Sequence, residues 1–203
     1  MLPLSRPCLI LATRLEARPL LKGTNFTCLW REGPAVLLRG RKFDLLLTGV
    51  GPVAAAYACG RVAALDHRRW VNLGIAGALS QGVAVGDILR VGSARLHGLV
   101  LPFGDDGAIA LARQGARLVT TPFAVHDPAL RRRLAAHADI VDMEGYAIAL
   151  AARRARRPLR MIKIASDLAD GRDRASLRRR AAELMARLWL EAGRAALSAG
   201  KSS

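Results

Sequence analysis

The sequence predicts an α/β fold in which helices cover both faces of a central mixed, twisted sheet. Short apolar runs typical of buried strands alternate along the chain with longer runs of helical periodicity. With 203 residues, of which 52% are apolar, the chain is long enough for one domain with a sizeable core and too short for two. We therefore expect a three-layer α/β/α sandwich, formed by a single domain over residues 1–199 and followed by a disordered tail at 200–203.

Each expected strand is a short apolar run that ends at polar or turn residues. The first is the run at 8–12, which ends at Thr13, and the next two form a hairpin closed by the turn residues 32–34. The strands are expected at residues 8–12, 28–31, 35–39, 44–48, 70–73, 87–91, 116–121 and 160–164.

The expected helices connect or follow these strands. The first begins near Leu15 and is interrupted by Pro19, whose ring is incompatible with a helix interior. Pro52 suits the first position of the second helix, where the missing N–H would be unpaired in any case. A glycine-rich segment at 74–77 follows the strand at 70–73, and the last helix is long and amphipathic. The helices are expected at residues 15–21, 53–65, 145–154 and 175–197.

The chain is strongly basic, with a net charge of +16. Nearly all of the basic residues are arginines, which crowd into 131–133, 153–160 and 172–180, as on exposed helix faces and helix ends. Aromatic residues are few and do not interleave with these runs, so the stacking surface of a single-strand binder is missing. A nucleic-acid partner is therefore disfavoured, while a noncatalytic Arg-rich binding protein stays open as an alternative.

The sequence gives no sign of export or of a membrane anchor. No apolar run reaches the roughly 18 residues that a membrane span needs, and residues 1–7 lack the features of a secretory signal. Cys8, Cys28 and Cys59 have neither disulfide nor metal-site spacing, so we interpret them as small buried hydrophobes. We expect a cytoplasmic protein without a membrane span, a metal or an organic cofactor.

Polar or glycine-rich clusters follow several of the expected strands. In sheets of this class ligands bind beyond the carboxyl ends of the strands, so Glu16, Glu144 and Asp167 are expected near one rim. Taken singly, each carboxylate also fits a structural role at the start of a helix. The clusters lie at residues 13–16, 49–52, 74–77, 142–145 and 163–170.

The order of these clusters resembles the purine nucleoside phosphorylase and nucleosidase superfamily. Within it the chain is most similar to the 5′-methylthioadenosine/S-adenosylhomocysteine nucleosidases and the futalosine hydrolases. The resemblance runs in order over almost the whole chain, and its most specific part is Met-Glu-Gly before an Ala-rich helix, paired with a later Ser-Asp. The matching strings are LILATRLEA at 9–17, LTGVGPVAAA at 47–56, VNLGIAGAL at 71–79, VDMEGYAIA at 141–149 and IASDLAD at 164–170.

The resemblance implies hydrolysis of the N-glycosidic bond of a 5′-substituted, adenine-type purine nucleoside, with release of the free base and the sugar. Asp167 would donate a proton to N7 of the purine, which requires a protonated carboxyl group in a partly dry pocket. Glu16 would be the general base that orients and deprotonates the attacking water. Glu144 would bind the ribose hydroxyls, with Met143 packed against the sugar, and so favour the electron-poor sugar of the transition state.

The other residues of the implied site bind substrate. Phe123 would stack on the base, although core packing explains that residue equally well. The backbone around Ala124 would hydrogen-bond the base. Two residues depart from the family: this chain has Ile75 where nucleosidases often have a serine, and Lys163 where they have an arginine. The remaining substrate-binding residues are Ile75, Ala76, Gly77, Ser166 and Lys163.

The resemblance leaves phosphorolysis open as an alternative. Arg14 could supply one charge to a phosphate, but Asn72 stands where phosphorylases have an arginine. The segment at 93–118 is shorter than the usual insert, which would admit a large or lipophilic 5′ group, as in short hopanoid-associated members, or would require completion by a partner subunit. A homodimer is expected, and His126 lies where family dimers lend residues to a neighbouring site, unless it is an ordinary surface histidine.

Overall fold

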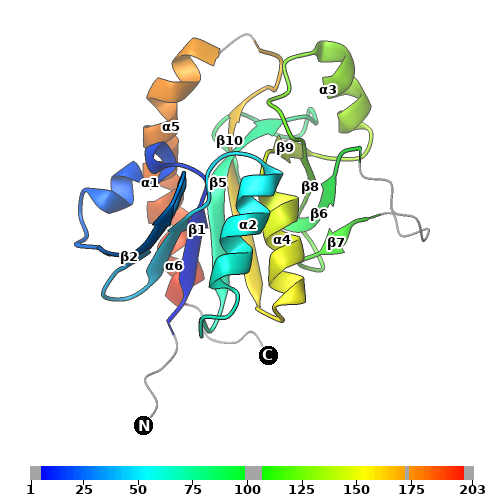
Figure 1. Cartoon of the computed structure of the whole chain (residues 1–203). Helices are drawn as coiled ribbons and strands as arrows, with labels where there is room; N and C mark the ends of the chain where they lie inside the picture. Colours follow the sequence, from blue (N-terminus) through cyan, green and yellow to red (C-terminus); the bar gives the residue numbers. More distant parts are fainter. Residues whose placement is uncertain (1–5, 99–106, 172–173, 199–203) are drawn as a thin grey trace.

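A mixed sheet forms the centre of the protein, which confirms the expected fold class (Figure 1). The structure, a computed structural model, describes residues 6–98, 107–171 and 174–198, so the expected tail at 200–203 and part of the shortened segment at 93–118 lie outside the described residues. The strands are β1 (Cys8–Leu11), β2 (Thr27–Glu32), β3 (Ala35–Arg39), β4 (Asp44–Leu47), β5 (Trp70–Ala78), β6 (Ile88–Leu96), β7 (Ile109–Ala110), β8 (Ala116–Thr120), β9 (Ile140–Asp142) and β10 (Leu159–Asp167).

The sheet is open on one side and closed into a ring on the other. From β5 it continues through β1, β4 and β3 to the edge strand β2. In the opposite direction β5 pairs with both β9 and β10, and these strands connect to each other through β8 and β6. Strands β1, β4, β5 and β10 run parallel to their neighbours in this group, so their carboxyl ends share one edge.

Helices cover the sheet on both faces, as the sequence predicts (Figure 1). On one face α2 packs against α4, and on the other α1 packs against α5. Local signals set the helix starts: a capping box of Thr13 and Glu16 begins α1, and Pro52 is the first residue of α2. The helices are α1 (Arg14–Leu21), α2 (Pro52–Val62), α3 (Pro128–Ala135), α4 (Gly145–Arg154), α5 (Arg174–Leu188) and α6 (Arg194–Ser198).

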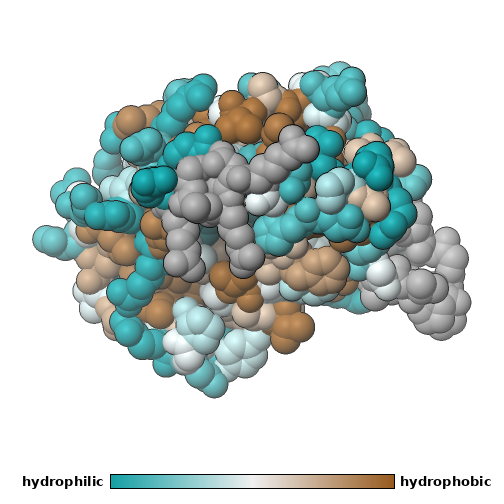
Figure 2. All heavy atoms as spheres, turned by 90° about the horizontal axis from the view of Figure 1, so that it is seen from above, coloured by the Kyte–Doolittle hydropathy of each residue, from teal (hydrophilic) through white to brown (hydrophobic). Residues whose placement is uncertain are grey.

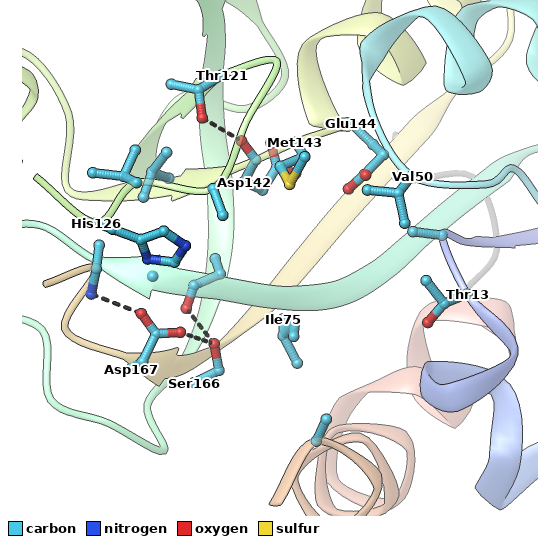
Figure 3. Close-up of a pocket in the computed structure, with 18 of the residues that line it drawn as sticks. Thr13, Val50, Ile75, Thr121, His126, Asp142, Met143, Glu144, Ser166 and Asp167 are labelled. Atoms are coloured by element: carbon cyan, nitrogen blue, oxygen red, sulfur yellow. Dashed lines mark hydrogen bonds between the residues drawn. The ribbon is translucent and has the colours of Figure 1, made fainter. Parts of the chain in front are cut away.

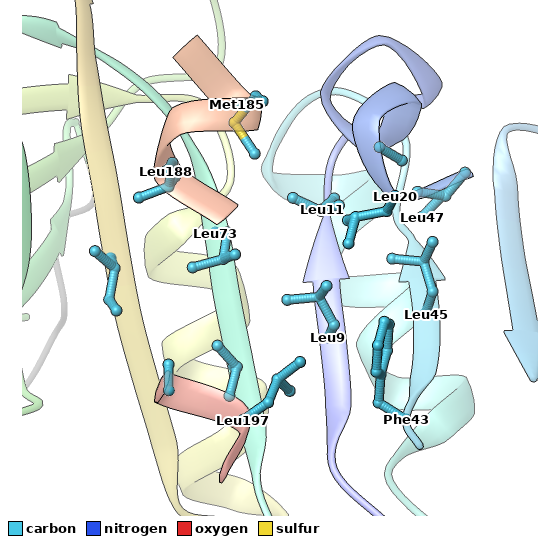
Figure 4. Packing of buried hydrophobic residues seen from close by; sticks show 14 of the residues in the cluster. Leu9, Leu11, Leu20, Phe43, Leu45, Leu47, Leu73, Met185, Leu188 and Leu197 are labelled. Atoms are coloured by element: carbon cyan, nitrogen blue, oxygen red, sulfur yellow. The ribbon is translucent and has the colours of Figure 1, made fainter. Parts of the chain in front are cut away.

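Alternating side chains of β1 pack into separate apolar clusters on the two faces of the sheet. Leu9 and Leu11 of β1 point to the face of α1 and α5, where they pack with Leu73 and Met185 (Figure 4). Ile10 of the same strand points to the face of α2 and α4. Because successive residues of a strand face opposite ways, a fully apolar strand is buried on both sides. This explains why the strands are continuous apolar runs.

The structure also corrects several expected boundaries. Strand β5 does not end at Leu73 but continues through the glycine-rich segment, and β10 extends to Asp167. Helix α3 and the short strands β7 and β9 were not expected as elements. The long terminal helix is divided, because a π-helical segment (Trp189–Gly193) separates α5 from α6. Despite Pro19, α1 continues to Leu21.

Candidate active site

A cavity of about 270 Å³ opens at the carboxyl-end edge of the parallel strands. Figure 2 shows this end of the molecule from above, with apolar side chains lying among hydrophilic ones. The ends of β1, β5, β9 and β10 form its walls, together with the turn after β4 and the loop between β8 and α3. Its lining residues are Ala12, Thr13, Leu15, Glu16, Val50, Ile75, Ala76, Gly77, Thr121, Ala124, Val125, His126, Val141, Asp142, Met143, Glu144, Ser166, Asp167, Ala169, Asp170, Gly171 and Ala181.

Most residues that the sequence suggested for the site meet in this cavity. Both suggested catalytic residues and all but two of the suggested substrate-binding residues line it; the exceptions are Phe123 and Lys163. The residues brought together are Glu16, Ile75, Ala76, Gly77, Ala124, Met143, Glu144, Ser166 and Asp167.

Asp167 is held at the end of β10 by hydrogen bonds to both carboxylate oxygens. The Ser166 hydroxyl donates to Oδ2 at 2.7 Å, and the backbone N–H of Ala169 donates to Oδ1 at 2.7 Å (Figure 3). The carboxylate lies over Gly77 of β5, where a Cβ atom would come within 3.3 Å of Oδ1 and 2.8 Å of the Ala169 Cβ. A side chain at Gly77 would therefore displace Asp167 and its loop.

Glu144 is a buried carboxyl group at the start of α4. Its Oε1 accepts a hydrogen bond of 2.7 Å from the N–H of Gly51, in the turn after β4. Burial, with a further contribution from the Asp142 carboxylate, raises the pKa of Glu144 to about 8. Near neutral pH the group is therefore mostly protonated in the free protein.

Glu16 caps a helix and lines the cavity. Oε2 accepts from the N–H groups of Ala12 and Thr13 and from the Thr13 hydroxyl, at 2.9 to 3.1 Å, within the capping box of α1. Oε1 accepts from the N–H of Ile75 at 3.3 Å. A Cβ atom on Gly74 would lie 3.1 Å from this oxygen, so the absent side chain lets the carboxylate approach β5.

Lys163 lies behind the cavity wall and is almost fully buried. Its Nζ forms an ion pair of 2.8 Å with Oδ2 of Asp142. The Thr120 hydroxyl donates to Oδ1 of the same carboxylate, and the N–H of Gly145 donates to both of its oxygens. Burial by itself would lower the pKa of Lys163, but the attraction of Asp142, with smaller contributions from Glu144 and Glu16, outweighs it and raises that pKa. Lys163 therefore carries a positive charge beneath the carboxylates.

Phe123 does not line the cavity. Its residue is 52% exposed, and its carbonyl oxygen accepts a hydrogen bond of 2.7 Å from the Thr121 hydroxyl. The next two residues of this loop, Ala124 and Val125, line the cavity. Core packing, the other explanation for Phe123, also does not apply to so exposed a side chain.

Several lining residues were not identified as site residues from the sequence. Asp142 and Val50 lie within clusters that the sequence did single out, so their position after strand ends was a usable signal. Arg14 is exposed and does not line the cavity. Within the described residues, no group of three or more His, Cys, Asp or Glu side chains could hold a metal ion.

The raised pKa of Glu144 predicts a pH-dependent stability. In the unfolded chain the group titrates near 4.5, and in the folded protein near 8, so the unfolded chain releases its proton first as the pH rises. The proton on Glu144 therefore stabilises the folded protein. This stabilisation is fully present below about pH 4.5 and is lost as the pH rises through 8. In the Glu144→Gln variant the amide at this position cannot ionise. The melting temperature of the variant should therefore fall less than that of the wild type between pH 5 and pH 9.

Thermal unfolding at several pH values measures this difference. Glu183→Gln, which changes an exposed glutamate of α5, is the matched control and should follow the wild type. Parallel curves for the wild type and Glu144→Gln would contradict the raised pKa.

Comparison with known proteins agrees with the resemblance expected from the sequence. A family model described as the phosphorylase superfamily matches residues 132–198. A search of curated proteins by sequence gave no match. Among solved structures, the chain is similar to futalosine hydrolase of Helicobacter pylori strain 26695, with a TM-score of 0.80 and 17% identity over 90% of this chain and 93% of that one.

Two nucleosidase structures show the same fold. The 5′-methylthioadenosine/S-adenosylhomocysteine nucleosidase from Neisseria meningitidis, in complex with methylthio-immucillin-A, has a TM-score of 0.78 and 22% identity over 91% of this chain and 96% of that one. The enzyme from S. pneumoniae, with the transition-state inhibitor MT-ImmA, has a TM-score of 0.79 and 20% identity over 90% and 94% of the two chains. At these identities the likeness establishes the fold.

Proposed function

We propose, from the match to the phosphorylase superfamily and the fold shared with nucleosidases, that the protein hydrolyses the N-glycosidic bond of a 5′-substituted, adenine-type purine nucleoside. One observation carries the proposal. Three carboxyl groups from distant parts of the chain, Glu16, Glu144 and Asp167, line one cavity at the carboxyl ends of the strands. This is the set that cleavage of such a bond requires: a proton donor, a group for the sugar and a group for the water.

Asp167 would be the general acid. Its protonated carboxyl group gives a proton to N7 of the purine while the bond between the sugar and N9 breaks, and the bonding electrons leave with the base. The hydrogen bonds from Ser166 and Ala169 stabilise the carboxylate that remains. The departing base is then neutral, which makes it a better leaving group.

Glu16 and Glu144 would act on the water and the sugar. Oε1 of Glu16, with one hydrogen bond from Ile75, has a free lone pair to orient the water and accept its proton as the oxygen adds to the sugar carbon. Glu144 would bind the ribose hydroxyls beside Met143. Because the sugar becomes electron-poor in the transition state, a negative charge on Glu144 is favoured more strongly there than in the free protein.

The charge of the cavity supports hydrolysis over phosphorolysis. Among its lining residues, which all belong to the described part of the chain, there is no arginine and no lysine, while five are Asp or Glu. A phosphate ion is bound by cationic side chains, and the nearby Lys163 is already paired with Asp142 behind the lining. Phosphorolysis is therefore the second candidate, and it would need Arg14 to turn inward.

A panel of nucleosides, each with and without phosphate, tests the proposal. We expect base release from methylthioadenosine, adenosylhomocysteine, futalosine, adenosine or inosine that does not depend on phosphate and leaves free sugar. Release only with phosphate, with a sugar phosphate as the product, would replace hydrolysis by phosphorolysis. Release from none of them, and from no nucleoside with a lipophilic 5′ group, would favour the noncatalytic Arg-rich binding protein.

The described residues contain no helix of the length and hydropathy that crossing a bilayer requires. A cytoplasmic location, a single domain over 1–199 and a homodimer are proposed with the same function. For the dimer, the exposed apolar residues Val50, Val53 and Tyr57 on and beside α2 form a candidate surface.

A further inference from the structure

The cavity contains one aromatic ring, and it is that of His126. Every other lining residue of the described chain is aliphatic, glycine, hydroxyl-bearing, carboxylic or methionine. No other residue of this lining has nitrogen in its side chain. Phe123, the residue expected to stack on the base, lies outside the lining.

The backbone on both sides of His126 is fixed. Val125 is buried in an apolar cluster with Leu79 and Leu130. Asp127 caps α3, since its carboxylate accepts from the N–H groups of Ala129 and Leu130 at 2.9 and 3.1 Å. These two anchors hold the backbone of His126 at the rim of the cavity, where the residue is exposed and its side chain lines the cavity.

His126 and Asp167 lie at the same end of the cavity. The loop after β10 leads from Asp167, through its bond with the Ala169 N–H, to Gly171. A Cβ atom on Gly171 would meet the Cβ of His126 at 3.2 Å, so this loop packs directly on the histidine backbone. Figure 3 shows the imidazole ring projecting into the cavity beside Asp167.

We infer that His126 is a specificity-determining residue whose imidazole ring packs against the purine base next to Asp167. The inference rests on the proposed function, because a base that receives a proton from Asp167 must lie within hydrogen-bond distance of that carboxyl group. A flat purine in that position meets the ring of His126 and no other aromatic surface of the lining. The histidine thus takes the stacking role that the sequence suggested for Phe123.

Variants at position 126 test the inference through binding of adenine, measured by calorimetry, and through KM for the best nucleoside of the panel. Stacking of a base on an aromatic ring is lost on substitution by alanine, so His126→Ala should weaken adenine binding and raise KM about tenfold. His126→Phe keeps a flat ring and should stay within about threefold of the wild type. His137→Ala, at an exposed histidine after α3, should match the wild type.

Three outcomes would overturn the inference. Wild-type affinity in His126→Ala, or a larger loss in Phe123→Ala, would move the stacking surface elsewhere. An equal loss in His126→Phe and His126→Ala would show that the ring nitrogens and not the ring face bind the base.

The calorimetry separates this inference from the proposed hydrolysis. If adenine binds the wild type tenfold more tightly than His126→Ala while no nucleoside is cleaved, the contact with the base holds and hydrolysis fails. If a nucleoside of the panel is cleaved but adenine binds the wild type and His126→Ala equally or not at all, hydrolysis holds and the contact with the base is rejected.

Discussion

Asp167→Asn is expected to lower the rate of base release by about a hundred- to ten-thousand-fold, the usual contribution of a general acid. Asparagine has no proton to give to N7, so the base must leave as an anion. The change should leave the fold intact, because the amide oxygen still accepts from the Ala169 N–H. Its NH₂ group can donate to Ser166, whose hydroxyl also has the carbonyl oxygen of Ala76 within 3.2 Å.

Steady-state kinetics on the best nucleoside of the panel measures this loss, with thermal unfolding as the check on folding. Asp66→Asn changes an exposed aspartate in an ion pair with Arg157, far from the cavity lining, and should keep full activity. Unchanged release by a folded Asp167→Asn protein would remove Asp167 as the proton donor.

Lys163→Met is expected to destabilise the protein by about 3 kcal/mol or more, because it leaves one partner of a buried ion pair without the other. Asp142 would keep its hydrogen bonds from Thr120 and Gly145 but lose the ammonium group at 2.8 Å. Glu16 and Glu144 would lose the same positive charge beneath them. The variant should therefore also lose activity without any direct contact between Lys163 and substrate.

Urea unfolding gives the free energy for this comparison. Lys42→Met, at an exposed lysine, is the matched control and should change stability little. Adding Asp142→Asn to Lys163→Met should recover part of the loss, since the uncompensated charge is then removed. A loss below about 1 kcal/mol would mean that the pair contributes no more than a surface ion pair.

The carboxylates could be predicted from the sequence because their positions depend on local signals. Glu16 follows β1 within a capping box, and Asp167 ends β10, so strand ends and caps were enough to bring them to one edge. The apolar strands and the start of α2 at Pro52 could be predicted for the same reason. Each of these features is decided by a few neighbouring residues.

Other parts depend on contacts between distant segments and left no clear local signal. The glycines of β5 suggest a turn, but pairing with β10 along nearly the whole strand keeps this segment extended. The partner of Lys163 lies 21 positions earlier in the chain and is reached only through the sheet. Phe123 lies outside the cavity lining while its neighbour Ala124 lines it, and this difference depends on the path of the whole loop between β8 and α3.

The closed ring of strands bears on how the protein opens locally. Strand β10, which ends at Asp167, is bonded to β5 on one side and, over residues 162–164, to β6 on the other. Strand β2 is bonded to β3 alone. Local fluctuations at β2 therefore break one row of hydrogen bonds, whereas fluctuations at β10 must break two. Asp167 at the end of β10 therefore stays in place while the β2–β3 hairpin opens locally. Local opening of the sheet and turnover at the cavity are then independent.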